Sequence, residues 1–516
     1  MVLTEATAPD ENIRPSTAAL PLIPAPAQLT REAGELTLPS LRISGPGETA
    51  SALARDLSAR FGDAADAAAD APAGIVLSLD TPASEDGSAA EGYVLDSLGD
   101  AVRISAATPA GLFYGTRTLL QLLTQAGDGC RVPRVHIEDA PRFAYRGVML
   151  DVARHFSPVD EVISYIDRAS ALKFNHLHLH LTDDQGWRIQ IDAWPLLTEL
   201  ASIGDGGRGP GGFYSKDDYR RIVEHAASRH MTVVPEVDLP GHTHAVGVAY
   251  PELVEQPVIS ELMVAEAQRL QQPLPAHGEH FSGWAVGHSS VRIHDEGTYR
   301  FVADVLGELA EMTPGPYLHI GGDECLGTSA EDFATFIERT TRIAAETGKT
   351  PIAWHEAGAV PGMAAGTVGQ YWGYSVPTGS HAEEALGFIE RDGGLIMSPS
   401  NRTYLDMKPD ADFPLGLTWA GTIPLRDAYD WDPAAIVPGA PESAILGVEA
   451  PLWTETVESP ADIDALVYPR ITAHAEIAWS PREGAERTWD SYIARLSALV
   501  PVLRASGVAI DDIPGA

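Results

Sequence analysis

The chain has 516 residues, 44% of them hydrophobic, and carries 35 basic against 72 acidic side chains, a formal net charge of −37. So acidic a surface repels phosphate backbones, which argues against a nucleic-acid partner, and no apolar run approaches the ~20 residues that a membrane-spanning helix needs. The two cysteines, Cys130 and Cys325, are too few for a disulfide scaffold or a zinc cluster.

The first residues have the composition of an unstructured segment. Residues 1–20 are polar and rich in proline and alanine, which predicts a loose arm. They lack the basic and apolar regions of a signal peptide. We therefore expect a cytoplasmic protein, or a secreted one if a leader has been removed from this sequence.

Residues 21–140 read as a small α+β domain. Strand-like segments at 35–38, 74–79, 92–95 and 101–106 precede a helix over 111–125, which carries Leu112, Leu119, Leu120 and Leu123 on one face. We expect this domain to end in turns near Pro133 and Pro141.

From Phe143 onward, strands and helices alternate, which predicts a (β/α)8 barrel over residues 141–516, closed by a C-terminal helix. Eight short apolar runs are the candidate strands: 147–152, 176–181, 232–237, 317–320, 351–354, 367–371, 394–398 and 445–450. Helical spacing is clear at 157–173, 215–230, 297–312, 329–348 and 381–391. The fifth and seventh connections carry only a weak helix signal.

Polar or aromatic side chains follow all eight candidate strands, at the barrel end where enzymes of this fold place their active sites. The most acidic of these edges is His319-Ile320-Gly321-Gly322-Asp323-Glu324. Acidic neighbours arise by chance in a chain this rich in carboxylates, but polar groups at every edge argue for a site.

Two adjacent carboxylates suggest a particular kind of acid/base chemistry. Most glycosidases place two carboxyl groups on opposite sides of the bond that they cleave. Neighbouring side chains diverge, so Asp323 and Glu324 cannot easily do this. Either one of them is the acid and its neighbour supports another step, or the substrate supplies its own nucleophile.

The tryptophans near the strand ends suit a sugar, whose apolar face stacks on indole rings. Four of the ten tryptophans are candidates: Trp354, Trp372, Trp419 and Trp453. Asp406 and Glu455 could accept hydrogen bonds from sugar hydroxyls and Arg154 could donate them. Tryptophans also fill protein cores, and for Trp419 the two interpretations weigh equally.

Seven ordered strings make the sequence similar to family 20 glycoside hydrolases, the bacterial β-N-acetylhexosaminidases. They are GVMLDVARHF, HLHLTDDQGWR, PEVDLPGHTHA, YLHIGGDE, QYWG, RTYLDMK and APLWTET. The similarity extends from about Leu20 to beyond Trp479 and includes AGLFYGTRTLLQLL in the N-terminal part. The resemblance implies an exo-acting, retaining enzyme that releases terminal GlcNAc or GalNAc from β-linked oligosaccharides, such as chitooligosaccharides, or from glycoconjugates.

The resemblance also implies a role for each candidate residue. Glu324 resembles the general acid/base, and Asp323 the residue that orients the 2-acetamido group of the substrate and stabilises an oxazolinium intermediate. Tyr404 would bind the acetamido oxygen, and Asp183 and His242 would form a relay behind the acid. The substrate-binding residues would be Arg154, Trp354, Trp372, Asp406, Trp419, Trp453 and Glu455. No cofactor and no metal are implied.

Four alternatives remain from the sequence. Residues 256–288 do not match the family pattern; a surface loop is favoured over a rim that shapes the leaving-group site. His176, His178 and His180 alternate on one strand, so a metal-dependent barrel hydrolase is a competing prediction. A sugar-binding protein without catalysis is a third, although it would be expected to lack Glu324. For Cys325, a small buried thiol is favoured over a nucleophile.

Overall fold

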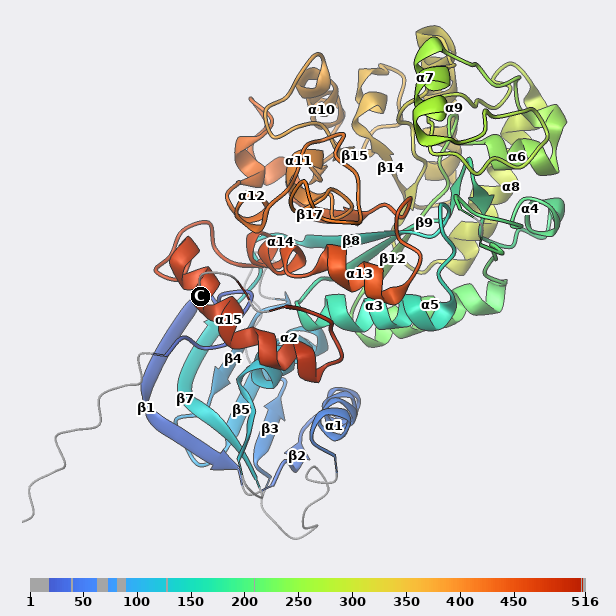
Figure 1. Ribbon diagram of the computed structural model, residues 1–516. Coiled ribbons are helices and arrows are strands. Elements are labelled where there is room, and N and C mark those ends of the chain that lie inside the picture. Colours follow the sequence, from blue (N-terminus) through green and yellow to red (C-terminus); the bar gives the residue numbers. More distant parts are fainter. Residues whose placement is uncertain are drawn as a thin grey trace, which may run out of the picture. The chain divides into compact units, whose positions relative to one another are not determined.

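The computed structural model describes residues 18–38, 40–62, 73–80, 90–126, 129–207, 209–511 and 513, which belong to two compact units (Figure 1). The first unit comprises residues 1–142 and 479–516, and the second comprises residues 143–478. Most of the predicted N-terminal arm, residues 1–17, lies outside the described residues. Leu20, at its end, is buried.

The first unit is built on a seven-stranded sheet. Its strands are β1 (Gln28–Leu38), β2 (Ile43–Ser44), β3 (Ile75–Ser78), β4 (Tyr93–Asp96), β5 (Val102–Ala106), β6 (Thr124–Ala126) and β7 (Gly129–Asp139). Their order is β1-β7-β4-β5-β3-β2, with β6 also paired to β7. Two helices belong to this part of the unit, α1 (Gly47–Phe61) and α2 (Pro109–Leu122). The α+β prediction is confirmed, although α1 and β7 were not predicted.

The predicted turn at Pro133 is wrong, because this proline lies inside β7. Proline cannot donate to a strand ladder and is tolerated at irregularities. Pro133 pairs with Glu35 of β1, where the register shifts between Arg31 and Glu35. This bulge explains how β7 continues through the residue.

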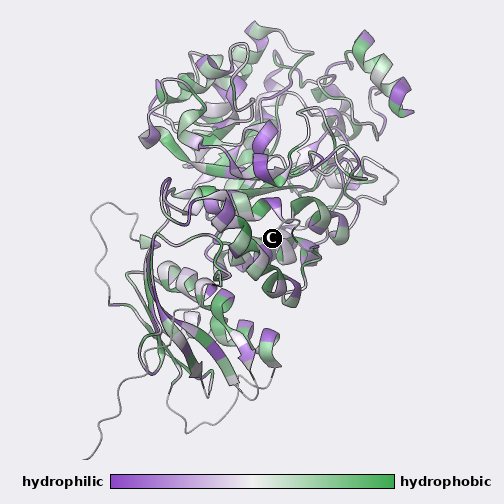
Figure 2. Ribbon diagram, turned by 60° about the vertical axis from the view of Figure 1, so that its left-hand side comes forward, coloured by the Kyte–Doolittle hydropathy of each residue, from purple (hydrophilic) through white to green (hydrophobic). Residues whose placement is uncertain are grey.

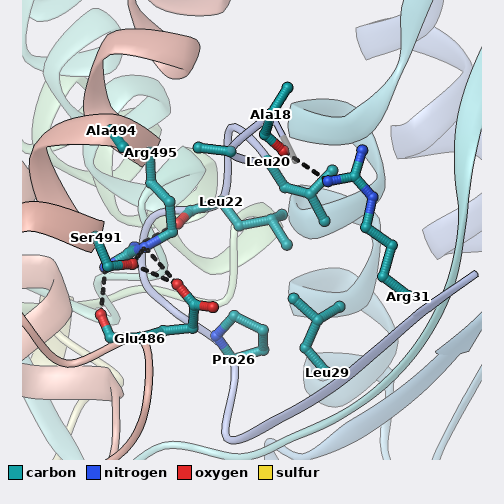
Figure 3. Close-up of a pocket in the computed structure, with 11 residues that line it drawn as sticks. Ala18, Leu20, Leu22, Pro26, Leu29, Arg31, Glu486, Ser491, Ala494 and Arg495 are labelled. Atoms are coloured by element: carbon teal, nitrogen blue, oxygen red, sulfur yellow. Dashed lines mark hydrogen bonds and ion pairs between the residues drawn. The ribbon is translucent and has the colours of Figure 1, made fainter. Parts of the chain in front are cut away.

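The C-terminal helix α15 (Trp489–Ala505) belongs to the first unit, whereas the sequence assigns it to the barrel domain. Its buried Arg495 donates from Nη1 to the Leu22 carbonyl at 2.6 Å. Just before the helix, Ser480 Oγ donates to the Ala25 carbonyl at 2.7 Å. Figure 3 shows Arg495 beside Leu20, Leu22 and Glu486 in a cavity of this unit. Hydrogen bonds between residues so distant in sequence leave no local signal, which is why the sequence misassigns the helix.

The second unit is a closed barrel of eight parallel strands, as predicted. In barrel order the strands are β8 (Tyr145–Asp151), β9 (His176–His180), β12 (Thr232–Glu236), β13 (Tyr317–His319), β14 (Thr350–Trp354), β15 (Val368–Tyr371), β16 (Leu395–Met397) and β17 (Ile445–Leu452). Each of the eight predicted strands coincides with one of them.

Helices connect most of the barrel strands. The predicted helices correspond to α3 (Val159–Ala171), α5 (Lys216–Ser228), α8 (Glu296–Met312), α9 (Ala330–Glu346) and α10 (His381–Ile389). The two weak connections hold only short elements: η4 (His355–Ala359) in the fifth, and α11 (Ser400–Thr403) and α12 (Leu425–Tyr429) in the seventh. Hydrophilic and hydrophobic residues alternate along the helices (Figure 2), as expected when one face of a helix is buried. None of the helices in the described part of the chain is long and apolar enough to cross a membrane.

The barrel interior is apolar at one level and polar at another. Tyr145, Val234, Ile352 and Ile396 belong to one apolar cluster. Inward-facing residues of alternate strands form the layers of such barrels, which are ordinarily filled by branched aliphatic side chains. Here one set of alternate strands, β9, β13, β15 and β17, instead contributes four fully or almost fully buried polar residues: His178, His319, Gln370 and Glu449. Buried polar groups are usually hydrogen-bonded, yet His178 Nε2, His319 Nε2 and Gln370 Oε1 of this level have no hydrogen-bond partner among the described residues.

Candidate active site

The acidic pair lies on a tight loop that directly follows β13. Gly321 and Gly322 have φ angles of 70° and 106°, which glycine adopts without strain. A β-carbon on Gly321 would lie 1.7 Å from Asp238 Oδ1, so no other residue fits there. Asp238 Oδ1 also accepts a hydrogen bond from the Gly322 N–H at 3.1 Å. The two glycines thus let the backbone turn against Asp238 and present Asp323 and Glu324.

A histidine and a second carboxylate stand behind Glu324. His242 Nε2 lies 3.6 Å from Glu324 Oε2 and 4.0 Å from Asp323 Oδ2. The other ring nitrogen, Nδ1, lies 3.1 Å from Asp183 Oδ1. Burial disfavours a charge on the ring, but Asp183 and Asp238 outweigh it and raise the pKa of His242. His242 is therefore held as a cation between carboxylates.

The surroundings of Glu324 favour its protonated form near neutral pH. Desolvation raises the pKa of Glu324 to about 7, against the opposing attraction of His242. About a third of its side chain remains exposed (32%), so the carboxyl can still reach a substrate. A carboxylic acid that holds a proton near pH 7 suits general acid catalysis.

Arg154 lies on the loop after β8 and joins several of the other candidate residues. Its Nη2 forms a 2.8 Å ion pair with Asp183 Oδ2, and its guanidinium lies 4.9 Å from the centre of the Trp453 ring. Burial disfavours its charge, but Asp183 and Asp151 outweigh this effect and raise the pKa of Arg154. The arginine stays charged next to an aromatic wall.

The aromatic candidates form a continuous wall. Ring centres lie 6.1 Å apart for Trp354 and Trp453, 6.2 Å for Trp453 and Tyr404, 5.7 Å for Tyr404 and Trp419, and 6.1 Å for Trp419 and Trp372. Trp354 is fully buried, whereas Trp419 is 47% exposed. The wall therefore extends from the barrel interior to the surface, as a sugar pocket requires.

Several carboxylates beside this wall are buried without a protein partner. Both Asp406 side-chain oxygens, Asp323 Oδ1 and Glu455 Oε2 accept no hydrogen bond. Burial and the neighbouring Glu455 raise the pKa of Asp406, and burial raises that of Glu455. Unsatisfied buried acceptors are rare in proteins, because each costs free energy. Gathered at one face of a barrel, they are the acceptors that a ligand rich in hydroxyl groups would satisfy.

Two further carboxylates at this face, Asp238 and Glu356, have no predicted role. Asp238 packs under Gly321, and Glu356 accepts from Trp372 Nε1 at 3.0 Å through Oε2. Burial and the neighbouring Asp323 raise the pKa of Glu356. Both residues follow candidate strands, so the sequence predicts their location at this end of the barrel. It does not predict which residues they contact.

Cys325 follows the acidic pair and is partly buried. Its Sγ donates to the Asp323 carbonyl at 3.1 Å. Burial raises the pKa of this thiol, the opposite of what a nucleophilic cysteine requires.

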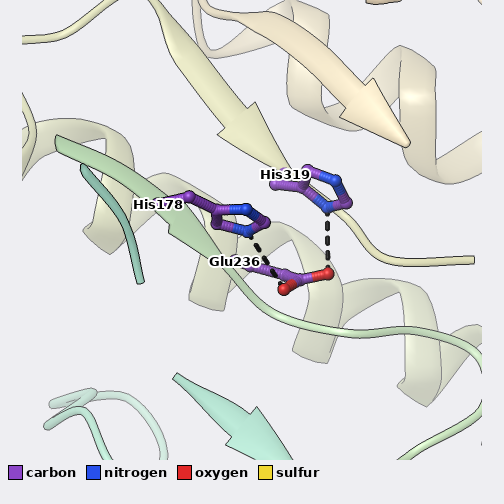
Figure 4. Close-up of side chains that lie close together, drawn as sticks. All are labelled: His178, Glu236 and His319. Atoms are coloured by element: carbon purple, nitrogen blue, oxygen red, sulfur yellow. Dashed lines mark ion pairs between the residues drawn. The ribbon is translucent and has the colours of Figure 1, made fainter. Parts of the chain in front are cut away.

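The histidines of β9 do not share a common centre. The ring of His176 stacks on Tyr145, with ring centres 4.0 Å apart. His178 Nε2, Glu236 and His319 Nδ1 do lie within 4.8 Å of one another (Figure 4). The Nε2 and Nδ1 atoms of His178 are, however, already 3.0 and 2.8 Å from the carboxylates of Glu236 and Glu449. We interpret this cluster as an ion-pair network.

The segment 256–288 contains one helix, α7 (Glu261–Leu270), capped by Ser260. The rest packs on loops near the site and is more than a surface loop. Gln185 Nε2 donates to the Gly283 carbonyl at 2.7 Å, and Trp284 Nε1 donates to the Gly206 carbonyl at 3.2 Å. Since Gln185 follows Asp183-Asp184, the segment borders the candidate site.

Each of the two units matches a known protein family. Residues 143–482 match the model of glycosyl hydrolase family 20, catalytic domain, and residues 19–140 match that of glycosyl hydrolase family 20, domain 2. A β-N-acetylhexosaminidase of Cellulomonas fimi is 39% identical over 428 residues, which cover 82% of this chain and 80% of that protein. A β-hexosaminidase of Vibrio furnissii is 32% identical over 424 residues, 74% of this chain and 64% of that protein.

Solved structures that resemble this chain belong to the same family. A family 20 β-N-acetylglucosaminidase superposes with a TM-score of 0.86 at 50% identity, covering 96% of this chain and 99% of that one. A mutant β-hexosaminidase of Streptomyces plicatus, in complex with its product GlcNAc, superposes with a TM-score of 0.86 at 41% identity, covering 98% of each chain.

Proposed function

The chain belongs to glycosyl hydrolase family 20, and from this premise we propose that it is an exo-acting β-N-acetylhexosaminidase. Its substrates are β-linked oligosaccharides or glycoconjugates that end in GlcNAc or GalNAc at the non-reducing end. The relatives named β-hexosaminidase, and the GlcNAc complex of the Streptomyces plicatus enzyme, support this substrate class.

The observation that carries the mechanism is the placement of Asp323 and Glu324 as neighbours on one loop. Two such carboxyl groups cannot flank a glycosidic bond as an acid and an enzyme nucleophile do. Both carboxylates lie near His242, but Glu324 is the closer of the two and the more exposed, with 32% of its side chain accessible against 11% for Asp323, and burial raises its pKa to about 7. The nucleophile must then come from elsewhere, and the 2-acetamido group of the substrate supplies it.

In the first step, Glu324 gives its proton to the glycosidic oxygen. The acetamido carbonyl oxygen attacks the anomeric carbon as the bond to the leaving group breaks, which yields an oxazolinium ion and a free alcohol. Asp323 orients the acetamido N–H and stabilises the positive charge, while the Tyr404 hydroxyl donates to the acetamido oxygen. Intramolecular attack of this kind can contribute ~7–11 kcal/mol in favourable systems.

In the second step, the Glu324 carboxylate takes a proton from water, whose oxygen attacks the anomeric carbon on the face that the leaving group has vacated. The oxazolinium ring opens, the acetamide is restored, and the anomeric configuration is retained. His242 stabilises Glu324 in the ionised state between the two steps, because its cationic ring lies 3.6 Å from the carboxylate. Asp183 acts indirectly, by keeping His242 charged through the contact with Nδ1.

The remaining candidate residues hold the sugar. Arg154, Asp406 and Glu455 bind hydroxyl groups, which would satisfy the partnerless oxygens of the two carboxylates. The aromatic wall packs against the sugar and its acetamido methyl group.

A panel of chromogenic glycosides tests the proposal. Aryl β-glycosides of GlcNAc and GalNAc should be cleaved, whereas the matched glucoside and galactoside with a plain 2-hydroxyl should be almost inert. Equal rates with and without the acetamido group would contradict substrate assistance. No turnover on any of the four would favour a sugar-binding protein.

A further inference from the structure

A series of alternating histidines and carboxylates continues from Asp183 into the barrel. Asp183 uses Oδ1 for His242 and its other oxygen, Oδ2, for His180, whose Nε2 lies 2.8 Å away. The opposite nitrogen of His180, Nδ1, forms a very short contact with Glu236 Oε2. His180 and Glu236 are fully buried and end the neighbouring strands β9 and β12.

The same alternation continues one level deeper. Glu236 Oε2 lies 3.0 Å from His178 Nε2, and His178 Nδ1 lies 2.8 Å from Glu449 Oε1. Figure 4 shows the carboxylate of Glu236 pointing between His178 and His319. We call the six residues His242, Asp183, His180, Glu236, His178 and Glu449 the His–carboxylate series.

The carboxylates around two of these rings favour their charged form. A neutral imidazole has one N–H and one lone pair, so only the imidazolium can donate from both nitrogens. His180 is hydrogen-bonded to a carboxylate through each nitrogen. His178 is hydrogen-bonded to Glu449 through Nδ1, and its Nε2 lies 3.0 Å from Glu236 Oε2 without a hydrogen-bond alignment. A neutral ring would direct a lone pair at an anion inside a buried, weakly screened site. Burial opposes the charges, but the flanking carboxylates outweigh it and raise the pKa of His178 to about 10 and that of His180 to about 9.

The other groups that face the series are compatible with these charges. Arg154 Nη1 lies 3.4 Å from His180 Nε2, and Arg154 Nη2 and His180 Nε2 each lie 2.8 Å from Asp183 Oδ2. The His319 ring is stacked on His178, and its Nδ1 accepts from the Gly321 N–H and also lies 3.0 Å from Glu236 Oε1. Burial lowers the pKa of His319 despite this carboxylate. The uncharged groups donate to the ends of the carboxylates: Trp354 to Glu236, and Tyr145 and Gln370 to Glu449.

We propose that His180 and His178 are buried imidazolium ions that act through Asp183 and His242 to set the pH range in which Glu324 carries its proton. Neither ring touches the substrate, so both are positioning residues. Cations and anions alternate along the series, which lets the barrel interior accept them without a net charge. The proposal rests on the assignment of Glu324 as the acid.

The direction of the effect follows from the sign of the charge. Removing a cation from the neighbourhood of a carboxyl raises its pKa, because the anion loses an attractive partner. The other charged or titratable groups near Glu324 are His242, Arg154, Asp323, Asp183 and Glu356, and the His180→Asn substitution leaves all of these side chains in place. The lost charge reaches Glu324 through Asp183, which contacts both His180 and His242. His180→Asn therefore keeps Glu324 protonated to higher pH.

The kinetic test compares three variants of the full-length enzyme on an aryl β-GlcNAc glycoside. The alkaline limb of the kcat/KM profile should move up by about half a pH unit in His180→Asn and by less in His178→Asn. The matched control is His176→Asn, at the start of the same strand and outside the series, where the limb should not move. A folded His180→Asn enzyme with the wild-type limb would overturn the proposal.

Neutron diffraction of the perdeuterated wild-type enzyme at pH 8 tests the charges without any substitution, in case His180→Asn does not fold. Deuterium on both ring nitrogens of His180 and His178 is expected. A bare nitrogen on either ring would overturn the proposal. This result does not depend on turnover, so failure of the hexosaminidase assignment and failure of the charge assignment are distinguishable.

Discussion

Asp238 occupies the space that a side chain on Gly321 would need, 1.7 Å from the position of its β-carbon. The loop that presents Asp323 and Glu324 can therefore adopt this conformation only with glycine at position 321, because glycine has no β-carbon. Gly321→Ala should displace the loop, and a displacement of ~1 Å at a reacting group can cost ~100-fold in rate. We expect kcat/KM to fall by at least this factor.

Gly348→Ala is the matched control for this change. Gly348 also has a positive φ, 84°, but nothing lies within 4 Å of the position of its β-carbon. Both substitutions cost ~1 kcal/mol of backbone strain, measurable as a lower Tm. Only Gly321→Ala should lose activity; equal losses would show that strain alone is responsible.

Replacing the acid should depend on the leaving group. Glu324→Gln keeps the shape of the side chain but cannot protonate the glycosidic oxygen. We expect ~10²–10⁴-fold lower kcat on a β-linked GlcNAc disaccharide, because general acid assistance is typically of this size. The loss should shrink on an aryl glycoside with an acidic phenol. Near-wild-type rates on both substrates would remove Glu324 from this role.

The pH dependence of kcat/KM should show the ionisation of Glu324. Glu324 must carry its proton to act as the acid, and burial raises its pKa to about 7. The kcat/KM value should therefore fall ~tenfold per pH unit above about pH 7. This limb should disappear in Glu324→Gln when the residual activity is followed over the same range. A limb that starts near pH 4.5 in the wild type would contradict the raised pKa.

The nucleophile can be tested by trapping. If the acetamido oxygen attacks, fluorination of the acetamide should slow turnover, because fluorine lowers the basicity of that oxygen. Asp323→Asn should lower kcat by weakening both orientation and charge stabilisation. Mass spectrometry after incubation with a 2-fluoro sugar should find the enzyme unmodified. A covalent sugar on Asp323 or any other carboxylate would assign the nucleophile to the protein.

Chelation separates this enzyme from the metal-dependent alternative. The nitrogens of His178 and His180 contact carboxylates on both sides, so activity should not depend on an added ion. The rate after exhaustive dialysis against EDTA should equal the untreated rate, and elemental analysis should find no stoichiometric metal. Activity lost to EDTA and restored by one divalent ion would support the metal-dependent hydrolase.

The barrel was predictable because its strands are buried on both faces and read as apolar runs that end in polar residues. The run 176–181 coincides with β9, and Asp183 and His242 lie beyond the strand ends where function was expected. The contact between His180 and Glu236 depends on the register of β9 and β12, in which these two residues are partners, and the sequence does not give that register. Periodicity carries no information about which inward-facing side chains meet.

The errors have a similar origin. Pro133 looks like a turn because a proline cannot donate, and only its pairing with Glu35 at a bulge shows why a strand tolerates it. The helix α15 looks like the end of the barrel because it follows the barrel in sequence. Its hydrogen bond to Leu22 shows that sequence order and spatial order differ.

The bond from Arg495 to Leu22 spans 473 positions of the chain. During synthesis, the segment around Leu22 leaves the ribosome before the barrel, and Arg495 leaves after it. The N-terminal sheet therefore lacks α15 until the whole of the second unit has been translated. A ribosome stalled after residue 478 would carry every barrel strand but an unfinished first unit, exposing the surface that α15 covers to chaperones and proteases.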